Sequence, residues 1–171
     1  HGRVWRIVRS GAPLTEIVDV TGMSASEQLA VLEHPERRTR DRARLALRMQ
    51  PTDAVTAAMG QWLARPDVTE HDQLEALWVL QNHDVVDESR LRRVLSSDDP
   101  RARAAAVRVL SAWSDRIPDT VELLHAAASD PAPRVRLEAV VAASWLDNLD
   151  GAEIALLASW YPTDRTLDHV L

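Results

Sequence analysis

The 171-residue chain contains no cysteine, no lysine and no phenylalanine. The absence of cysteine excludes disulfides, Cys-ligated zinc, iron–sulfur clusters and CxxCH haem attachment from this segment. The sequence has no Gly-rich phosphate loop, GxSxG motif or HExxH motif, and no apolar run approaches the roughly 20 residues of a transmembrane helix. We therefore expect this segment to bind no cofactor or metal, to span no membrane and to perform no catalysis.

The chain is acidic overall. Its 26 Asp and Glu residues outnumber its 20 basic residues, which are all Arg, and the formal net charge is −6. Proteins that bind nucleic acid usually carry a surplus of basic residues, because phosphate contacts dominate their affinity. We therefore expect the partner to be a protein, either a neighbouring domain or another subunit, and not a nucleic acid.

Six tryptophans and one tyrosine supply all the aromatic side chains. Tryptophans can form a stacking platform, but more often they fill core positions that phenylalanine would otherwise occupy. We expect core or partly buried packing for each of Trp5, Trp62, Trp78, Trp113, Trp145 and Trp160.

The first nine residues, HGRVWRIVR, differ from the rest of the chain. Their β-branched and aromatic side chains predict a short strand over 1–9, with no partner strand among the helices that follow. Glycine and proline then mark residues 10–23 as a linker, and residues 24–171 have helical patterns. Because the chain begins with His1 and ends with the apolar pair Val170-Leu171, we expect it to be a piece of a longer protein.

A small residue recurs in the helical part at steps of 33, 30 and 33 residues, and an apolar residue follows it four positions later. Residues four apart lie on one helix face, so each pair marks a core contact where two helices approach closely. The predicted core positions are Ala43, Leu47, Ala76, Leu80, Ala106, Leu110 and Ala139.

A second helical stretch precedes each of these, and Ser24–Glu27, Asp119–Glu122 and Asp150–Glu153 have the spacing of capping boxes. The pattern is helix–turn–helix four times, with a partial fifth unit. One such pair cannot bury its apolar stripe, whereas stacked pairs can. The sequence therefore predicts an all-α fold, a right-handed α-α superhelix of about four to five helix pairs with a short N-terminal β-strand.

The segments DDPRARAAA (98–106) and DPAPRVRLEA (130–139) resemble HEAT repeats. The resemblance covers residues 24–171 and implies a scaffold of helix pairs. It also implies a ladder between neighbouring units, in which an Asp of the turn pairs with an Arg early in the second helix. The positions that match are Asp98 or Asp99, Asp130, Arg40, Arg103 and Arg136, and we expect Asp130 and Arg136 to form one rung. The second unit departs from the pattern, with Asp72-Gln73 where the family has an apolar residue and Arg.

Two short motifs, GRVWRI (2–7) and DRTLDHVL (164–171), give a narrower resemblance. In this order, with helical repeats between them, they are similar to motifs of membrane-bound dehydrogenases of planctomycetes and verrucomicrobia. That resemblance implies a middle domain, between a β-propeller and a cytochrome c domain, in an exported haem-containing protein of the periplasm or cell envelope. The alternative is a free-standing HEAT-type adaptor that binds a protein along its concave face.

The strongest local charge feature is a run of arginines between residues 37 and 48. Arg40, Arg44 and Arg48 share one helix face, and Arg37 lies one turn before them. Arg37, Arg44 and Arg48 are therefore candidates for docking to an acidic partner. The alternative, which we favour, is a solvated helix surface together with the ladder.

The best acid–base cluster is Glu70-His71-Asp72 with Glu75, in which His71 and Glu75 are one turn apart. A metal site or a general-base pair could be drawn there. We favour the interpretation that these residues begin a helix, since acidic side chains are stabilising near a helix N-terminus.

Overall fold

The structure is a computed structural model that describes residues 10–11, 17–146 and 149–170. The described part of the chain contains α-helices and no β-strand, which confirms the all-α expectation. The strand expected over residues 1–9 lies outside the described residues. The helices are α1 (Ala25–Val31), α2 (Arg37–Arg48), α3 (Thr52–Leu63), α4 (Glu70–Asn82), α5 (Glu88–Leu95), α6 (Pro100–Ala112), α7 (Thr120–Ala128), α8 (Pro133–Ala143), α9 (Leu149–Ser159) and α10 (Arg165–Val170).

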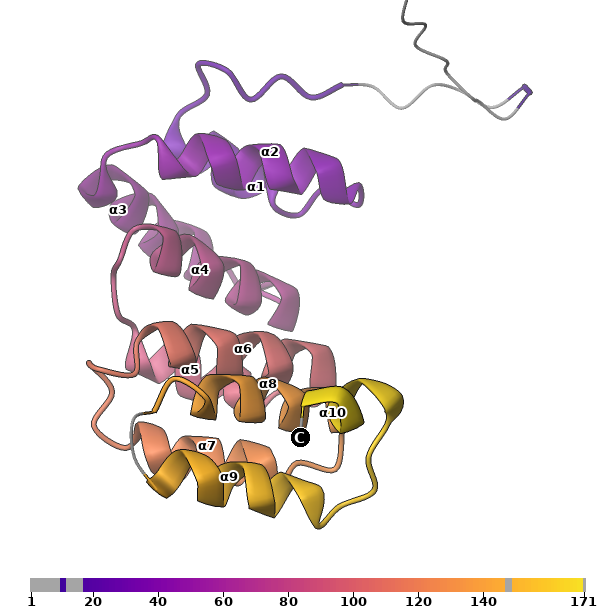
Figure 1. Ribbon diagram of the computed structural model, residues 1–171. Coiled ribbons are helices and arrows are strands. Elements are labelled where there is room, and N and C mark those ends of the chain that lie inside the picture. The colour runs from indigo at the N-terminus through magenta and orange to yellow at the C-terminus, as the bar shows by residue number, and fades with distance from the viewer. Residues whose placement is uncertain (1–9, 12–16, 147–148, 171) are drawn as a thin grey trace, which may run out of the picture.

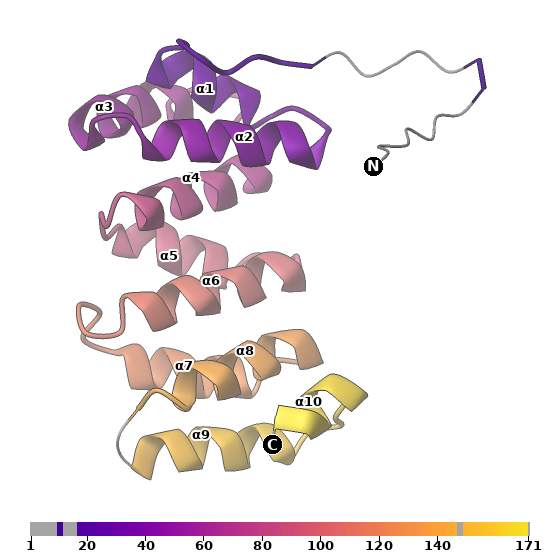
Figure 2. The same cartoon turned by 45° about the horizontal axis from the view of Figure 1, so that its top comes forward.

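The helices form pairs that stack in chain order, from α1–α2 at one end to α9–α10 at the other (Figures 1 and 2). The second helices of the pairs, α2, α4, α6, α8 and α10, each pack on the next, and their surface is called the second-helix face below. Among the first helices, α1 packs on α3 and α7 on α9, whereas a groove of about 640 Å³ separates α3 from α5. None of the described helices is long and apolar enough to cross a membrane.

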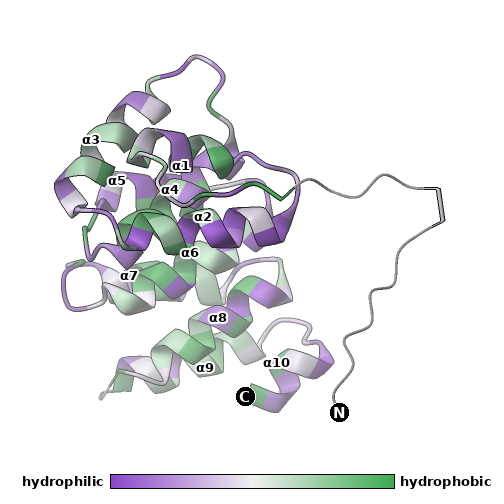
Figure 3. Ribbon diagram, turned by 90° about the horizontal axis from the view of Figure 1, so that it is seen from above, coloured by the Kyte–Doolittle hydropathy of each residue, from purple (hydrophilic) through white to green (hydrophobic). Residues whose placement is uncertain are grey.

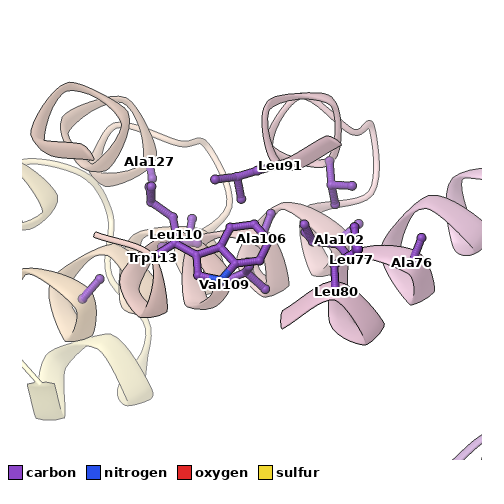
Figure 4. Packing of buried hydrophobic residues seen from close by; sticks show 14 of the residues in the cluster. Ala76, Leu77, Leu80, Leu91, Ala102, Ala106, Val109, Leu110, Trp113 and Ala127 are labelled. Carbon is purple, nitrogen blue, oxygen red and sulfur yellow. The ribbon is translucent and has the colours of Figure 1, made fainter. Parts of the chain in front are cut away.

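The repeated small and apolar positions form the core, as predicted. Ala43, Ala76, Ala106 and Ala139 are fully buried, and the apolar residues four positions later are buried with them. Figure 4 shows Ala106 beside other members of this cluster in α6. Alanine at these positions permits the close approach of neighbouring second helices, because it leaves little side-chain volume between the backbones.

The segment before α1 is held against the first helix pair by two side-chain amides. Gln28 of α1 donates to the carbonyl of Val20 at 3.2 Å, and Gln50, just after α2, donates to that of Met23 at 3.2 Å. Residues 17–24 therefore contact the array although they contain no helix.

Only one of the three expected capping boxes is present in the structure. Ser24 and Glu27 form the box at the start of α1. Asp119 precedes α7, but its side chain makes no capping bond. The third expectation is also wrong, because α9 begins at Leu149 and Asp150 therefore lies inside its first turn.

The tryptophans divide into two groups. Trp62 and Trp113 are buried and Trp78 is half-buried, as expected, whereas the first tryptophan of the chain lies outside the described residues. The expectation is wrong for Trp145 and Trp160, which are 78% and 73% exposed. Trp145 follows α8 and Trp160 follows α9, so both lie in connections between helices and not on a buried helix face.

Candidate functional site

The candidate site is the polar surface of the second helices, and its geometry begins with three arginines at equivalent positions. Each arginine donates from Nη1 to two backbone carbonyls of the turn before its helix, six and five residues earlier. These carbonyls would otherwise lack partners, so the bonds hold each turn against the first turn of the second helix. The bonds join Arg40 to His34 and Pro35 (2.8 and 2.9 Å), Arg103 to Ser97 and Asp98 (2.8 and 3.2 Å), and Arg136 to Asp130 and Pro131 (2.7 and 3.2 Å).

The same arginines also reach the next helix pair. Arg103 donates from Nε and Nη2 to both carboxylate oxygens of Asp130, at 2.7 and 2.9 Å. Arg40 lies 3.6 Å from the carboxylate of Glu75. Arg136 donates to the carbonyl of Pro162 and lies over the ring of Tyr161, 5.5 Å from its centre. Each contact joins one pair to its successor, with a different acceptor.

The rung expected between the side chains of Asp130 and Arg136 is absent. The carboxylate of Asp130 accepts from Arg103 and from the backbone N–H of Ala132, whereas Arg136 contacts only the backbone carbonyl of Asp130. Asp99 also lies outside any contact between units, because its carboxylate caps α6 and pairs with Arg101. The turn aspartate therefore pairs backwards, with the arginine of the preceding unit.

The second unit has Gln73 at the position of these arginines. Its side-chain oxygen accepts a hydrogen bond from Arg90 of α5. The contact still joins one unit to the next, but the donor now belongs to the following unit. A glutamine can take this place because its amide supplies an acceptor as well as donors.

Glu75 is the buried charge at the centre of the second-helix face. Its side chain is fully buried, and Arg44 of α2 donates to both of its oxygens at 2.7 and 2.6 Å. Burial lowers the pKa of Arg44, but the hydrogen bonds and charge of Glu75 outweigh it and raise that pKa above its ordinary value. His71 is 3.4 Å from Glu75. A carboxylate held in this way is a structural ion pair, because neither oxygen is free to act as a base.

A groove of about 590 Å³ lies on the second-helix face between α2, α4 and α6. Arginines line its rim, and half-buried Leu74 and Trp78 lie at its base. Arg44 lies over the Trp78 ring, 4.9 Å from its centre. The helix that contributes most of the arginines, α2, is coloured mainly as hydrophilic in Figure 3. The lining residues are Arg37, Arg40, Arg44, His71, Leu74, Glu75, Trp78, Gln81, Asn82, Asp99, Arg101 and Ala102.

The stacked helix pairs and the polar contacts between them recur together, and a family model describes the same unit. Residues 88–168 match HEAT repeats. The matched residues run from α5 into α10 and include the contact between Arg103 and Asp130. HEAT repeats are typically protein-interaction scaffolds. Comparison with curated proteins and comparison with solved structures each gave no significant match.

The three arginines that were candidates for docking differ in their exposure and in their ion pairs. Arg44 is bound within the fold by Glu75 and Asp41, and its side chain is only 19% exposed. Arg37 is 84% exposed, and among the described residues it pairs only with Asp41, at 3.6 Å. Arg48 is exposed and makes no ion pair in the described part of the chain. Arg37 and Arg48 therefore remain available to a partner.

The interpretation of Glu70-His71-Asp72 as a helix start is supported by a capping box that sequence reasoning missed. Thr69 accepts from the amide of Asp72, and Asp72 accepts from the amide of Thr69. No group of three or more metal-ligating side chains occurs among the described residues.

The ion pairs along the second-helix face were also missed, although the sequence contains a signal for them. Arg44 and Glu75 are 31 residues apart, and Arg108 and Glu138 are 30 residues apart, joined at 2.7 Å. Both separations are close to one repeat. A search for opposite charges one repeat apart would therefore have found the two pairs, because neighbouring units place equivalent positions side by side.

Removal of the Arg103 side chain should destabilise the array. Arg103→Ala breaks the paired bonds to Asp130 and leaves two turn carbonyls without their donor. We expect the free energy of unfolding to fall by about 1–3 kcal/mol in urea titrations followed by circular dichroism. The control is Arg101→Ala, since Arg101 is fully exposed and its one ion pair within the described residues is with Asp99, and it should leave stability nearly unchanged. Equal losses in the two variants would contradict this role.

The same contact predicts a pH dependence. Burial raises the pKa of Asp130, but the bonds from Arg103 and the Ala132 amide lower it more, so the pKa lies below its ordinary value. The stability from this ionised carboxylate is therefore present above about pH 4 and is lost as the pH falls through the lowered folded pKa. Asp130→Asn should show a shallower loss of stability below about pH 4 than the unmodified protein. Equal slopes in thermal unfolding would refute the prediction.

Proposed function

We propose that this chain is a non-catalytic scaffold, a HEAT-like array in a right-handed α-α superhelix, that binds another protein through its second-helix face. The single observation that carries the proposal is the groove between α2, α4 and α6, and the HEAT-repeat match of residues 88–168 supports it. The non-catalytic part of the proposal is supported by the way in which the charged residues of this face are bound. Glu75, the carboxylate with the least solvent access on this face, is fully engaged by Arg44.

The test is site-specific photo-cross-linking in cells that produce the protein. A photoreactive amino acid replaces either Asn82 or Arg101 at the groove, or Gln61 or Glu122 on the first helices, all of which are exposed. We expect discrete protein adducts from the two groove positions and none from the two first-helix positions. Adducts from the first-helix positions alone, or none from any position, would overturn the proposal.

The wider context that we propose is a connector within a larger exported, haem-containing dehydrogenase-like protein, with the free-standing adaptor as the alternative. It rests on the motifs over 2–7 and 164–171, of which the first lies outside the described residues. The second motif also has a structural role, since Asp164 accepts from the amides of Thr166 and Leu167 at the start of α10, and Leu167 is buried.

Mass spectrometry of the protein produced from its own gene, with a haem absorbance spectrum, tests this context. A mass far above 19.1 kDa together with a haem band is the expected result for the connector. A mass near 19.1 kDa without haem would instead establish the free-standing adaptor. The scaffold function applies in either context, so this experiment separates the two without bearing on the groove.

A further inference from the structure

The groove on the second-helix face carries the opposite charge to the chain as a whole. Four arginines line it against the two carboxylates of Glu75 and Asp99, although the whole chain has a formal net charge of −6. Glu75 is already neutralised by Arg44. At the rim, Arg37 and Arg101 are 84% and 88% exposed. In the part of the chain that the structure describes, each pairs with an exposed carboxylate of its own unit, and such pairs contribute little stability. An acidic partner can therefore replace these carboxylates at small cost.

Two side-chain amides in the groove lack hydrogen-bond partners. Gln81 and Asn82, at the C-terminal end of α4, line the groove, and their side chains make no hydrogen bond in the described part of the chain. A primary amide both donates and accepts, which is what the N–H and C=O groups of an extended peptide need. A small anion only accepts hydrogen bonds, so the oxygens of these amides would make no contact with it.

The base of the groove is apolar, because the pattern of ion pairs is interrupted there. Arg44–Glu75 joins α2 to α4, and Arg108–Glu138 joins α6 to α8. No ion pair joins α4 to α6 in the described part of the chain, and Trp78 lies in the gap with Leu74 and Ala102. The half-buried Trp78 ring can receive an apolar side chain between the two charged contacts.

We propose that this groove binds an extended peptide segment in which acidic side chains flank one apolar side chain. The acidic side chains meet Arg37 and Arg101, the apolar one meets Trp78, and the peptide backbone meets Gln81 and Asn82. Two helix-to-helix steps of about 10 Å separate α2 from α6, and an extended chain covers that distance with about six to eight residues. The inference rests on the proposed function and adds the chemistry of the partner to it.

Nucleic acid fits the groove less well. A phosphate chain requires a continuous row of free cations, whereas Arg40 and Arg44 are directed at Glu75 and Asp99 lies on the groove wall. A peptide with spaced carboxylates matches Arg37 and Arg101, the two exposed arginines at the edges of the groove, and can replace the exposed carboxylates that they hold.

The test is fluorescence anisotropy with the full chain and labelled probes. The first probe is a peptide of about eight residues with Glu and Asp on both sides of one Leu. The second has Lys at each acidic position, and the third is a single-stranded DNA of matched length. We expect the acidic peptide to bind at least about tenfold more tightly than either other probe, and less tightly as salt is added.

Variants of exposed arginines supply the matched controls. The double variant Arg37→Gln/Arg101→Gln should weaken binding of the acidic peptide by about tenfold, because both rim charges are removed. Arg93→Gln should change it by less than about twofold, since Arg93 lies on α5 and pairs with Glu70 at 3.5 Å, much as Arg37 pairs with Asp41. All three residues are exposed, so the fold should survive, and circular dichroism verifies this.

Three results would overturn the inference: no binding of the acidic peptide, equal binding of the lysine peptide or the DNA, or equal loss in the Arg93→Gln variant. Groove-specific cross-links together with any of these results would leave the scaffold function intact and refute only the partner chemistry. Peptide binding without groove-specific cross-links would refute the proposed function instead. The groove would then be able to bind an acidic peptide, but it would not be the surface that the protein uses in cells.

Discussion

The arginine in the first turn of the second helix is the contact on which the array depends. In three of the units it satisfies two carbonyls of its own turn and reaches the following unit with the rest of its guanidinium. One side chain thus fixes both the conformation inside a helix pair and the position of the next pair. The planar guanidinium with five donors suits this double role, which a lysine ammonium could not fill with the same geometry. The apolar core supplies the driving force for stacking, and the arginines determine how successive units are aligned.

In this arrangement, most of the charged side chains discussed above form contacts within the fold. Glu75, Asp130 and Glu138 all accept hydrogen bonds from arginines of the preceding unit, and Glu75 and Glu138 occupy equivalent positions in α4 and α8. Buried ion pairs of this kind contribute little net stability over apolar packing but are costly to break, so they specify one alignment of the units over others. The charged groups left for a partner are then few, and they lie at the rim of the second-helix face, where Arg37 and Arg101 are exposed.

The sequence correctly predicted the features that repeat with the unit, which are the helix pairs and their buried positions. It failed for contacts that depend on how one unit is aligned with the next. The recurring alanines and leucines identified the helix pairs and the buried positions, because burial in a solenoid repeats with the unit. The partner of Asp130 could not be found from its own motif, since the choice between Arg103 and Arg136 depends on how two units are aligned. Trp145 and Trp160 were expected inside from residue type alone, but burial depends on place in the fold as well, and both lie just after a helix and are exposed. Asp119 has the spacing of a capping residue, yet its carboxylate accepts from Arg92 instead.

The step from the second unit to the third departs from the repeat pattern twice. In the second unit Gln73 replaces the arginine of the other units, and in the third unit the position in α6 that corresponds to Glu75 and Glu138 is Ala105. No ion pair joins α4 to α6 in the described part of the chain. Sequences that specify a fold consistently tend to violate their own pattern at functional sites. Between these two helices the groove opens, and Trp78, Gln81 and Asn82 line it between two charged contacts. The missing ion pair therefore coincides with the groove that we propose as the binding site for another protein.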